Sequence, residues 1–504
     1  MSSEDQSTLA AHISKVLGLD SAAVAVEYQG AAVTWGELAR CAAEIERCLA
    51  AAGIDRSAPI GWAARNRPGA VAAFVALAAS GRMIVPLRPN YATAAFRDDI
   101  RAQRLQAVIG DPEDWAGDGV IEAAQEAGSL GIEVAGPPLA VRLHPELAEP
   151  GLGPYRAAAP GFVLERLTSG TTGAPKRIPV REDVLIPSLR SGEQKRPGEQ
   201  PEPLRLKKSP ALLFKPFSHA GGLFGLLLSL YQARPIVLFE KFKVDDWVAA
   251  VRKYRPQSAS LVPAMIRMLL EAEIDLADLS SLRAIRSGTA PLEPEIQEAF
   301  EARFGVPILI DYGAAEFIGG LAGWSLDDYR AFGKVKRGSV GRARPDVAIR
   351  VVDQAARTPQ PAGEIGIIEI RSDRYGPDWI STNDLASIDA DGFVFLRGRA
   401  DDAINRGGFK ILPEEVAAVL RQHPDIADAA VIGAPDARLG QVPVAAIEVS
   451  EGAQAPDGKS LSAFLRERLP AYMVPVEYHV LAELPRTASL KINRPALKQL
   501  LGLA

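Results

Sequence analysis

The chain has 504 residues, of which 47% are hydrophobic and 24% are charged, and its formal net charge is −5. This length predicts more than one domain, and the near-neutral charge gives no reason to expect nucleic-acid binding. The longest uncharged apolar run, 220–231, is too short to cross a bilayer, and the polar, acidic start is unlike a secretion signal. We therefore expect a cytoplasmic protein without a membrane span.

The first 90 residues alternate between helical and strand-like segments. Thr34 and Glu37 have the spacing of a capping box, which predicts a helix that begins after Thr34. Strand-like runs at 24–28, 60–62 and 83–87 alternate with this helix and with an alanine-rich helix near 70–79. Such alternation is typical of a layered α/β domain with a parallel sheet. Residues 110–160 show few clear periods and are predicted to form short strands and surface loops.

A loop rich in hydroxyls and glycines follows the strand-like run 162–164. It reads Leu-Thr-Ser-Gly-Thr-Thr-Gly-Ala-Pro-Lys over 167–176. Glycines allow successive backbone N–H groups to face one anion, the hydroxyls add donors, and Lys176 adds a full positive charge. A Walker loop would need Lys and then Ser or Thr after its last glycine, where this chain has Ala174 and Pro175. The sequence predicts a polyphosphate-binding loop of another kind.

This loop resembles the signature loop of the AMP-forming adenylate-forming superfamily, which includes acyl- and aryl-CoA ligases, amino-acid adenylation domains and luciferases. Further segments resemble later motifs of the same family and occur in the same order, at 215–223, 287–292, 312–316, 381–384, 391–399, 401–411 and 484–494. The resemblance covers roughly residues 10–500 and implies ATP and Mg²⁺ as requirements.

The resemblance also implies roles for individual residues. Tyr312 would stack on adenine, Asp384 would accept both ribose hydroxyls, and Glu316 would hold the metal ion on the nucleotide phosphates. The residues implied to be catalytic are Lys491, Glu316, Lys176 and Thr171. Those implied to bind ATP or AMP are Thr168, Ser169, Gly170, Thr172, Gly173, Gly288, Thr289, Ala290, Asp311, Tyr312, Gly313, Asp384 and Arg399. The acid pocket would be lined by His219, Gly221, Gly222, Leu223, Ala314 and Ala315.

The family's domain organisation implies an α/β fold with a large N-terminal domain of layered α/β subdomains and a small, mobile α+β C-terminal domain. We expect the N-terminal AMP-binding domain over 1–398, a hinge over 399–402 that includes Asp401, and the C-terminal domain over 403–504. Gly407, Gly408 and Lys410 resemble the loop that reaches the active site during thioester formation.

Four positions depart from the family pattern. Arg177 and Asn383 stand where glycine is usual, Ala315 replaces a hydroxyl residue, and Leu490 replaces the glycine before the lysine. These departures leave open a catalytically weak member of the fold. A homodimer also stays open.

The resemblance implies activation of a carboxylic acid to an acyl-adenylate, followed by transfer to CoA. Ser218 stands where amino-acid adenylation domains carry an aspartate, which argues against an amino-acid substrate. The pocket loops contribute no charge, so we expect an apolar acid, either aryl or medium-chain. The alternative is a stand-alone ligase that loads the acyl group onto a separate carrier protein.

Overall fold

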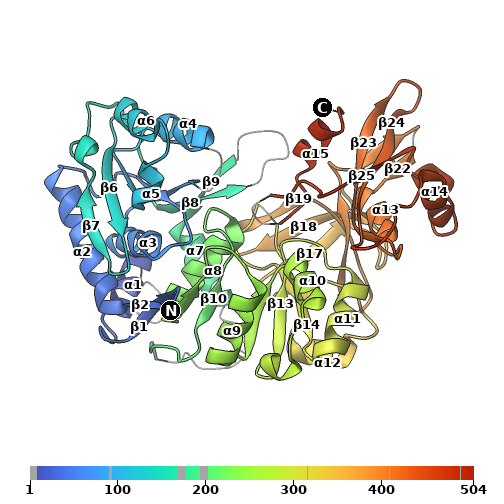
Figure 1. Ribbon diagram of the computed structural model, residues 1–504, viewed down its shortest axis with the longest axis horizontal. Coiled ribbons are helices and arrows are strands. Elements are labelled where there is room, and N and C mark those ends of the chain that lie inside the picture. The colour runs from blue at the N-terminus through green and yellow to red at the C-terminus, as the bar shows by residue number, and fades with distance from the viewer. Residues whose placement is uncertain are drawn as a thin grey trace. The chain divides into compact units, whose positions relative to one another are not determined.

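The computed structural model describes residues 8–89, 93–168, 176–192, 203–314, 316–407, 409–487 and 490–503. Its elements form an α/β fold in which helices pack on several sheets (Figure 1). Contacts divide the described residues into two compact units. The first unit takes in the chain up to residue 260 and the segment 268–285. The second takes in 261–267 and the chain from 286 onward.

A seven-stranded sheet lies at the centre of the first unit, in the order β7-β6-β5-β3-β4-β8-β9. Its strands are β3 (Ile60–Ala63), β4 (Ile84–Leu87), β5 (Ala107–Gly110), β6 (Leu130–Ala135), β7 (Ala140–Leu143), β8 (Phe162–Thr168) and β9 (Lys176–Arg181). The five inner strands run parallel, whereas β7 and β9 lie antiparallel at the edges. The strands β3, β4 and β5 are buried throughout, as is typical of parallel strands covered on both faces.

A four-stranded sheet in the order β10-β11-β1-β2 also belongs to the first unit. Its strands are β1 (Val24–Tyr28), β2 (Ala31–Thr34), β10 (Ala211–Leu213) and β11 (Ile236–Leu238). The helices of this unit are α1 (Leu9–Leu17), α2 (Trp35–Ala51), α3 (Pro68–Ser80), α4 (Thr93–Gln103), α5 (Pro112–Trp115), α6 (Val120–Ala127), α7 (Glu182–Gly192), α8 (Ala220–Tyr231) and α9 (Val244–Tyr254), with 3₁₀ turns η2 (Pro145–Leu147) and η3 (Leu276–Leu279).

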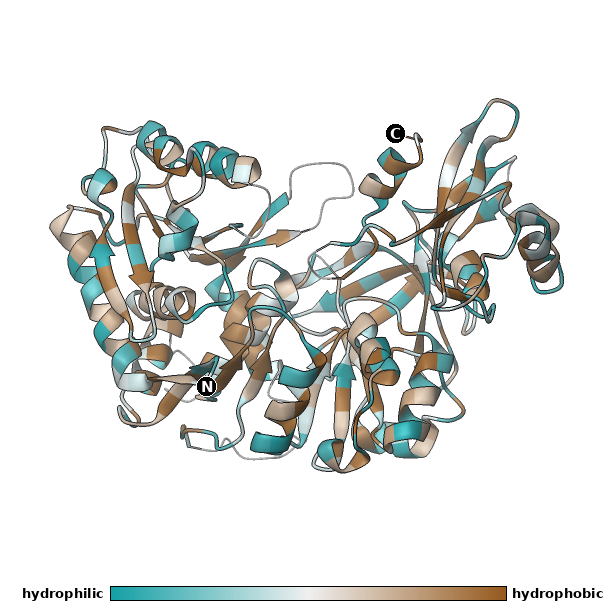
Figure 2. Cartoon of the chain, in the orientation of Figure 1, coloured by the Kyte–Doolittle hydropathy of each residue, from teal (hydrophilic) through white to brown (hydrophobic). Residues whose placement is uncertain are grey.

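Two of these helices show how the sequence specifies the fold. The predicted capping box at the start of α2 is confirmed, because the Thr34 hydroxyl accepts from the Glu37 N–H and the Glu37 carboxylate accepts from the Thr34 N–H. Residues 68–78 of α3 are all buried, and this helix packs against α1 and α2. In Figure 2 the hydrophobic colour runs along α8 and the inner strands. The core of the first unit therefore surrounds its long sheet.

The prediction for residues 110–160 is partly wrong. The structure has the helices α5 and α6 there as well as strands β6 and β7. Gly119 and Gly128 flank α6, both with positive φ, so the glycines that obscured the period are the caps of a short helix. Ala123, Ala124 and Ala127 are the buried face of that helix. The helix therefore packs through small apolar residues at helical spacing. Because alanine is only weakly hydrophobic, such residues give a weak periodic signal in the sequence.

Three elements lie where the chain passes from one unit to the other: β12 (Ser258–Leu261), α10 (Pro263–Glu271) and β13 (Ala284–Ser287). The second unit begins with α11 (Pro294–Phe304), β14 (Ile308–Tyr312), β15 (Ala322–Gly323), α12 (Leu326–Phe332) and β16 (Arg342–Ala343). An antiparallel sheet follows, in the order β17-β18-β19-β20, made of β17 (Ala348–Val352), β18 (Gly366–Ser372), β19 (Gly376–Ile388) and β20 (Val394–Arg399). Neighbouring strands of this sheet place Asp384 directly opposite Arg399.

The last part of the second unit holds a mixed sheet in the order β22-β21-β24-β23, with β25 beside β24. Its elements are β21 (Ile404–Arg406), β22 (Phe409–Ile411), α13 (Pro413–Leu420), β23 (Ile426–Asp436), β24 (Gly440–Val449), α14 (Gly458–Arg466), η4 (Ala471–Met473), β25 (Glu477–Leu481) and α15 (Arg494–Leu500). Val416, Leu420, Ile447 and Leu461 belong to one buried cluster between these helices and strands. The predicted alternation of helix and strand is present, and the boundary at 399–402 stays a prediction.

None of the helices within the described ranges is both long and apolar enough to cross a membrane.

Candidate active site

A tyrosine and an aspartate meet in the second unit. Tyr312 ends β14, and its hydroxyl donates to Asp384 Oδ2 at 2.7 Å. Burial raises the pKa of Tyr312 above its ordinary value, and the negative charge of Asp384 raises it further. The phenol therefore stays protonated and serves as a donor to the Asp384 side chain. Glu316 is exposed, and its charge also acts to raise the pKa of Tyr312.

Arg399 lies between two carboxylates. Its Nη1 is 3.6 Å from Asp384 Oδ1, while its Nε and Nη2 each donate to Asp401 at 2.9 Å. The bidentate contact lowers the pKa of Asp401 below its ordinary value. The predicted ribose-contacting pair and the predicted hinge residue are thus adjoining parts of one ion network.

Lys491 lies within electrostatic reach of this network. Its side chain remains accessible to solvent, but protein atoms crowd its amine. Desolvation lowers the pKa of Lys491, the positive charge of Arg399 lowers it further, and Asp384 opposes both effects. The structure therefore brings together four residues that the motifs single out over 180 positions of sequence: Tyr312, Asp384, Arg399 and Lys491.

The neighbour of the lysine adopts a conformation that suits glycine. Leu490 has a φ of 62°, in the left-handed region where the family usually has glycine. A side chain there costs about 1–2 kcal/mol. Asn383, in contrast, is compatible with β19, because it is not among the residues with positive φ and its carbonyl accepts from the Ala400 N–H at 2.8 Å. The substitution at 490 therefore strains the backbone, and the one at 383 does not.

The strain at Leu490 predicts an inverted order of stability between two variants. Within a helix or strand, glycine ordinarily makes a protein less stable than alanine at the same position does, by about 0.5–1 kcal/mol. At a position with positive φ we expect Leu490→Gly to exceed Leu490→Ala in free energy of unfolding by about 1 kcal/mol. Urea denaturation of the two variants measures this difference. An alanine variant that is equal or superior in stability would contradict the strained conformation.

The segment 287–290 lies against the end of β14. A side chain at Gly288 would place its Cβ 2.9 Å from the carbonyl oxygen of Asp311, so this position needs glycine. Thr289 has a φ of 74°, an unusual conformation that is often found at functional sites. Thr289 is exposed, and Ala290 after it is half-buried. The predicted nucleotide loop is therefore tightly fitted to the strand that carries Asp311 and Tyr312.

Two arginines bind the carboxylate of Asp311, and the motifs gave no indication of either. Arg286 Nη1 lies 3.0 and 2.9 Å from the two Asp311 oxygens, and Arg344 Nη2 lies 2.5 Å from Oδ1. Burial lowers the pKa of Arg344, while the charge of Asp311 opposes that shift. Gly323 is required beside them, since a Cβ there would lie 2.3 Å from Asp311 Oδ1. The side chain of Asp311 is thus held in one orientation.

The phosphate loop lies mostly outside the described residues, which include neither 169–175 nor the side chain of Thr168; the site residues concerned are Ser169, Gly170, Thr171, Thr172 and Gly173. The two ends of the loop are described: Thr168 closes β8, Lys176 opens β9, and the two face each other in the antiparallel register. The side chain of Lys176 is exposed. The hairpin therefore holds the two ends of the loop together.

Arg177, the first departure from the family pattern, ties this hairpin to the surrounding sheet. Its guanidinium donates to the carbonyl of Pro86 at 3.0 Å, to Asp99 at 2.5 Å and to Glu165 at 3.3 Å. Glu165 is buried, with 1% of its surface exposed, and it also pairs with Arg156. The arginine is therefore a structural anchor beside Lys176, and glycine could not make these contacts.

Removal of this anchor should destabilise the protein. Arg177→Gly is expected to lower the free energy of unfolding by about 3–5 kcal/mol, because it leaves Asp99 and Glu165 short of a buried partner. Arg181→Gly is the matched control in the same strand, since Arg181 pairs with Asp183 at the surface and such pairs contribute about 0–1 kcal/mol. Thermal and urea unfolding compare the two. Equal losses would show that glycine in the strand, and not the lost ion pairs, causes the effect.

The predicted acid motif is held in the first unit by a buried asparagine. Asn66 accepts from the Phe217 N–H at 3.0 Å and donates to the Lys215 carbonyl at 3.0 Å. Gly222 packs so closely on this loop that a Cβ would lie 2.1 Å from the Pro216 carbonyl. His219 is the N-cap residue of α8. Gly222 is therefore required by contacts within the chain, and its place in the acid pocket stays a prediction. Leu223 is buried.

The remaining predicted residues are placed as follows. Gly407 has a φ of 55° and its N–H donates to the Leu439 carbonyl at 2.8 Å, and Lys410 Nζ donates to Gln354. Gly313 and Ala314 follow Tyr312, with Gly313 exposed and Ala314 half-buried. Gly408 and Ala315 lie outside the described residues, and Gly221 lies half-buried in the first turn of α8. In the part of the chain that the structure describes, no three His, Cys, Asp or Glu side chains form a group able to hold a metal ion.

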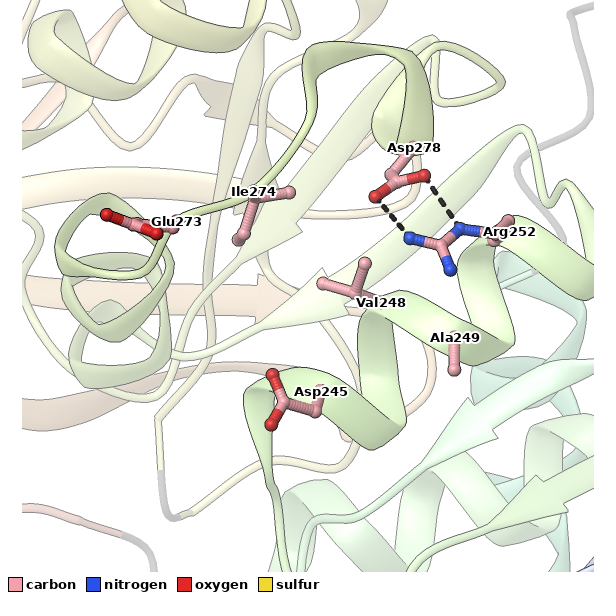
Figure 3. A pocket seen from close by; sticks show the side chains of 7 residues that line it. All are labelled: Asp245, Val248, Ala249, Arg252, Glu273, Ile274 and Asp278. Atoms are coloured by element: carbon pink, nitrogen blue, oxygen red, sulfur yellow. Dashed lines mark hydrogen bonds and ion pairs between the residues drawn. The ribbon is translucent and has the colours of Figure 1, made fainter.

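One surface depression of about 220 Å³ contains none of the predicted site residues. It lies between α9 and the segment around η3, and Figure 3 shows Arg252 and Asp278 facing each other across it. Two hydrogen bonds of 2.8 and 2.7 Å join these side chains. Arg252 and Asp278 neutralise each other, and the depression contains no residue of the network around Asp384.

Known proteins match this chain over most of its length. Residues 18–376 match the AMP-binding enzyme family, and residues 415–491 match the AMP-binding enzyme C-terminal domain. The 4-coumarate–CoA ligase-like 9 of Oryza sativa subsp. japonica is 27% identical over 516 residues, which cover 93% of this chain and 88% of that protein. The sulfoacetate–CoA ligase of Cupriavidus necator is 28% identical over 491 residues, which cover 92% of each.

Solved structures share the fold. The crystal structure of ATP-bound MatB from Rhodopseudomonas palustris superposes with a TM-score of 0.82 at 23% identity, covering 97% of this chain and 98% of that one. The predicted fold class, with a large N-terminal and a small C-terminal domain, is confirmed. The chain therefore belongs to the AMP-binding enzyme family and is an AMP-forming enzyme related to acid–CoA ligases.

Proposed function

We propose that this protein uses ATP to activate an aryl or medium-chain carboxylic acid and then transfers the acyl group to CoA. The observation that supports this most is that Lys491 lies within electrostatic reach of both Asp384 and Arg399, which are themselves paired. Asp384 accepts from Tyr312 and still has lone pairs for the two hydroxyls of a ribose. An amine next to a ribose-binding carboxylate is suited to a reaction at the α-phosphate of the same nucleotide.

The first step joins two anions. A carboxylate oxygen of the acid attacks the α-phosphorus, the bond to the β-phosphate oxygen breaks, and pyrophosphate leaves. Positive charge must offset the repulsion between the reacting groups, and Lys491 and Lys176 supply it in this chain. A magnesium ion held by Glu316 would supply further charge; one carboxylate together with substrate phosphates is a usual magnesium site. No protein nucleophile is needed.

The second step releases AMP. The sulfur of CoA attacks the acyl carbon, the carbon–oxygen bond to AMP breaks, and AMP leaves with both electrons of that bond. An adenylate is the better acyl donor because its phosphate oxygen is a good leaving group, whereas the oxide of a free carboxylate is not. Gly407, Gly408 and Lys410 are the residues that we assign to this step, and the Asp401 hinge would bring them to the adenylate.

The acid is assigned from the pocket residues. His219, Leu223 and Ala314 carry no fixed charge, which favours an apolar acid over a dicarboxylate. One similar protein is named for 4-coumarate, an aromatic acid, and another for sulfoacetate, an acid with a second anionic group. A panel of acids must therefore contain both kinds.

ATP–pyrophosphate exchange over such a panel tests the proposal. We expect exchange with aryl or medium-chain acids and little with dicarboxylates, sulfonated acids or amino acids. Each active acid is then offered with CoA alone or with a phosphopantetheinylated carrier protein alone. Thioester formation only on the carrier would establish the alternative acceptor, and absence of exchange with every acid would support a catalytically weak member of the family.

A further inference from the structure

A buried arginine in the second unit contacts three carboxylates. Arg421 caps the C-terminal end of α13, and its side chain is 12% exposed. It donates to Glu293 at 2.6 Å, to Glu414 at 2.6 Å and to Asp428 at 2.9 Å. Desolvation acts to lower the pKa of Arg421, but the three carboxylates outweigh it and raise that pKa. The guanidinium is therefore charged and fully engaged.

One of these carboxylates comes from a different part of the chain. Glu414 and Asp428 lie in α13 and β23, in the predicted C-terminal domain with Arg421. Glu293, in contrast, is the N-cap residue of α11 and directly follows the nucleotide loop 287–292. It has a second partner on its own side, because Arg267 Nη2 lies 2.5 Å from Glu293 Oε2. The ion pair between Glu293 and Arg421 thus links the predicted C-terminal domain to the nucleotide loop.

The network continues from Arg421 to the segment that carries Lys491. Asp428 also accepts from Arg486 at 2.6 Å. Arg486 forms an antiparallel bridge with Ile492, and the carbonyl of Lys491 accepts from the Thr487 N–H at 2.8 Å. A continuous series of ion pairs and backbone contacts therefore runs from Glu293 to the backbone of the predicted catalytic lysine.

The ion pair between Glu293 and Arg421 can break without leaving either charge unpaired. Breaking a buried ion pair is costly when it leaves a charge without a partner. Here separation of Glu293 from Arg421 leaves Glu293 with Arg267, and Arg421 with Glu414 and Asp428. Each side keeps its neutralising partner, so this contact can be lost at a lower cost than an isolated buried pair.

We propose that Glu293 is a positioning residue for adenylation: its ion pair with Arg421 holds the C-terminal segment in the arrangement in which Lys491 lies within electrostatic reach of Asp384 and Arg399. This inference rests on the proposed function for the role of Lys491. It assigns a task to a residue that none of the sequence motifs singles out. Glu293 acts through Lys491 and does not itself touch the reacting atoms.

Glu293→Gln is the variant that tests it, because glutamine keeps the shape and removes the charge. A hydrogen bond to a charged partner shifts an equilibrium by roughly ten- to a hundredfold, so we expect pyrophosphate exchange to fall within that range. Transfer of a supplied acyl-adenylate to CoA should stay at the wild-type rate or rise. Glu295→Gln is the matched control in the same helical turn, because Glu295 accepts a long hydrogen bond of 3.5 Å from the neutral Gln422 side chain. Both half-reactions should be unchanged in this variant.

A distance measurement tests the same claim without catalysis. Fluorescent labels on cysteines introduced at Ala299 in α11 and Lys459 in α14, with Cys41 and Cys48 replaced, report the separation of the two segments. Wild type and Glu295→Gln should show one main separation, and Glu293→Gln should add a second population. Equal losses in both half-reactions, or an unchanged distance distribution, would overturn the proposal. If the wild-type protein showed no ATP–pyrophosphate exchange with any acid, the proposed function would be wrong. The distances between the labels would still decide whether Glu293 holds the C-terminal segment.

Discussion

Lys491→Ala is expected to slow adenylate formation by roughly a hundred- to a thousandfold, the loss that follows removal of one preorganised charge-stabilising group. The reason is that the amine lies within electrostatic reach of Asp384 and Arg399, where we propose that two anionic reactants meet. Transfer of a supplied acyl-adenylate to CoA should be nearly intact, because no charge repulsion of that kind arises in the second step. Pyrophosphate exchange and single-turnover thioester formation measure the two steps separately.

The control for this variant is Lys498→Ala, an exposed lysine in the last turn of α15, which should leave both steps unchanged. The pH profile adds a second check. An ordinary lysine has a pKa near 10.4. Because the pKa of Lys491 is lowered, Lys491 loses its proton at a pH below that value. Wild-type adenylation should therefore decline in that range, and Lys491→Arg should flatten the decline. Equal damage to both steps would argue against a role confined to adenylation.

Asp384→Asn should raise the KM for ATP by roughly ten- to a hundredfold, since hydrogen bonds to a charged acceptor contribute about 1.5–3 kcal/mol. The neutral amide would accept fewer hydrogen bonds from a ribose and would no longer neutralise Arg399. The same change should lower the pKa of Tyr312 toward its ordinary value, because the charge of Asp384 is one cause of its elevation. Calorimetric titration with ATP and ultraviolet titration of tyrosine measure the two effects.

Asp378→Asn is the matched control for this experiment. Asp378 lies in the same strand, β19, and is exposed. We expect nucleotide binding like that of wild type. If Asp384→Asn also bound ATP as tightly as wild type, the assignment of Asp384 to the ribose would be wrong.

Local patterns were enough to predict much of the fold. The capping box at Thr34 and Glu37, the buried strands β3 and β4, and the alternation of elements after residue 403 all depend on neighbours within a few positions. The helix α6 was missed because its two flanking glycines and three buried alanines weaken the periodic signal. Tertiary burial, which stabilises such a helix, has no local signature.

The candidate site also contains residues that the sequence predicted and contacts that it did not. Tyr312, Asp384, Arg399 and Lys491 each lie in a motif, so their resemblance to a family was readable from the sequence. The partners of Asp311, Arg177 and Arg421 were not predicted, since the contacts join residues far apart: Arg177 meets Asp99, and Arg421 meets Glu293. Charged residues are common on any surface, and only the folded chain shows which of them are buried together.

The path of the chain between its two units affects how it can fold during synthesis. Residues 261–267 belong to the second unit, after which the chain returns to the first at 268–285. The returning segment is tied in by the Arg283 N–H, which donates to the Gln257 carbonyl at 2.7 Å. Domains generally fold as they emerge from the ribosome. The first unit is complete only once residue 285 has left the exit tunnel. Until then, apolar surface that 268–285 would cover stays exposed, for longer than in a unit that ends at residue 260.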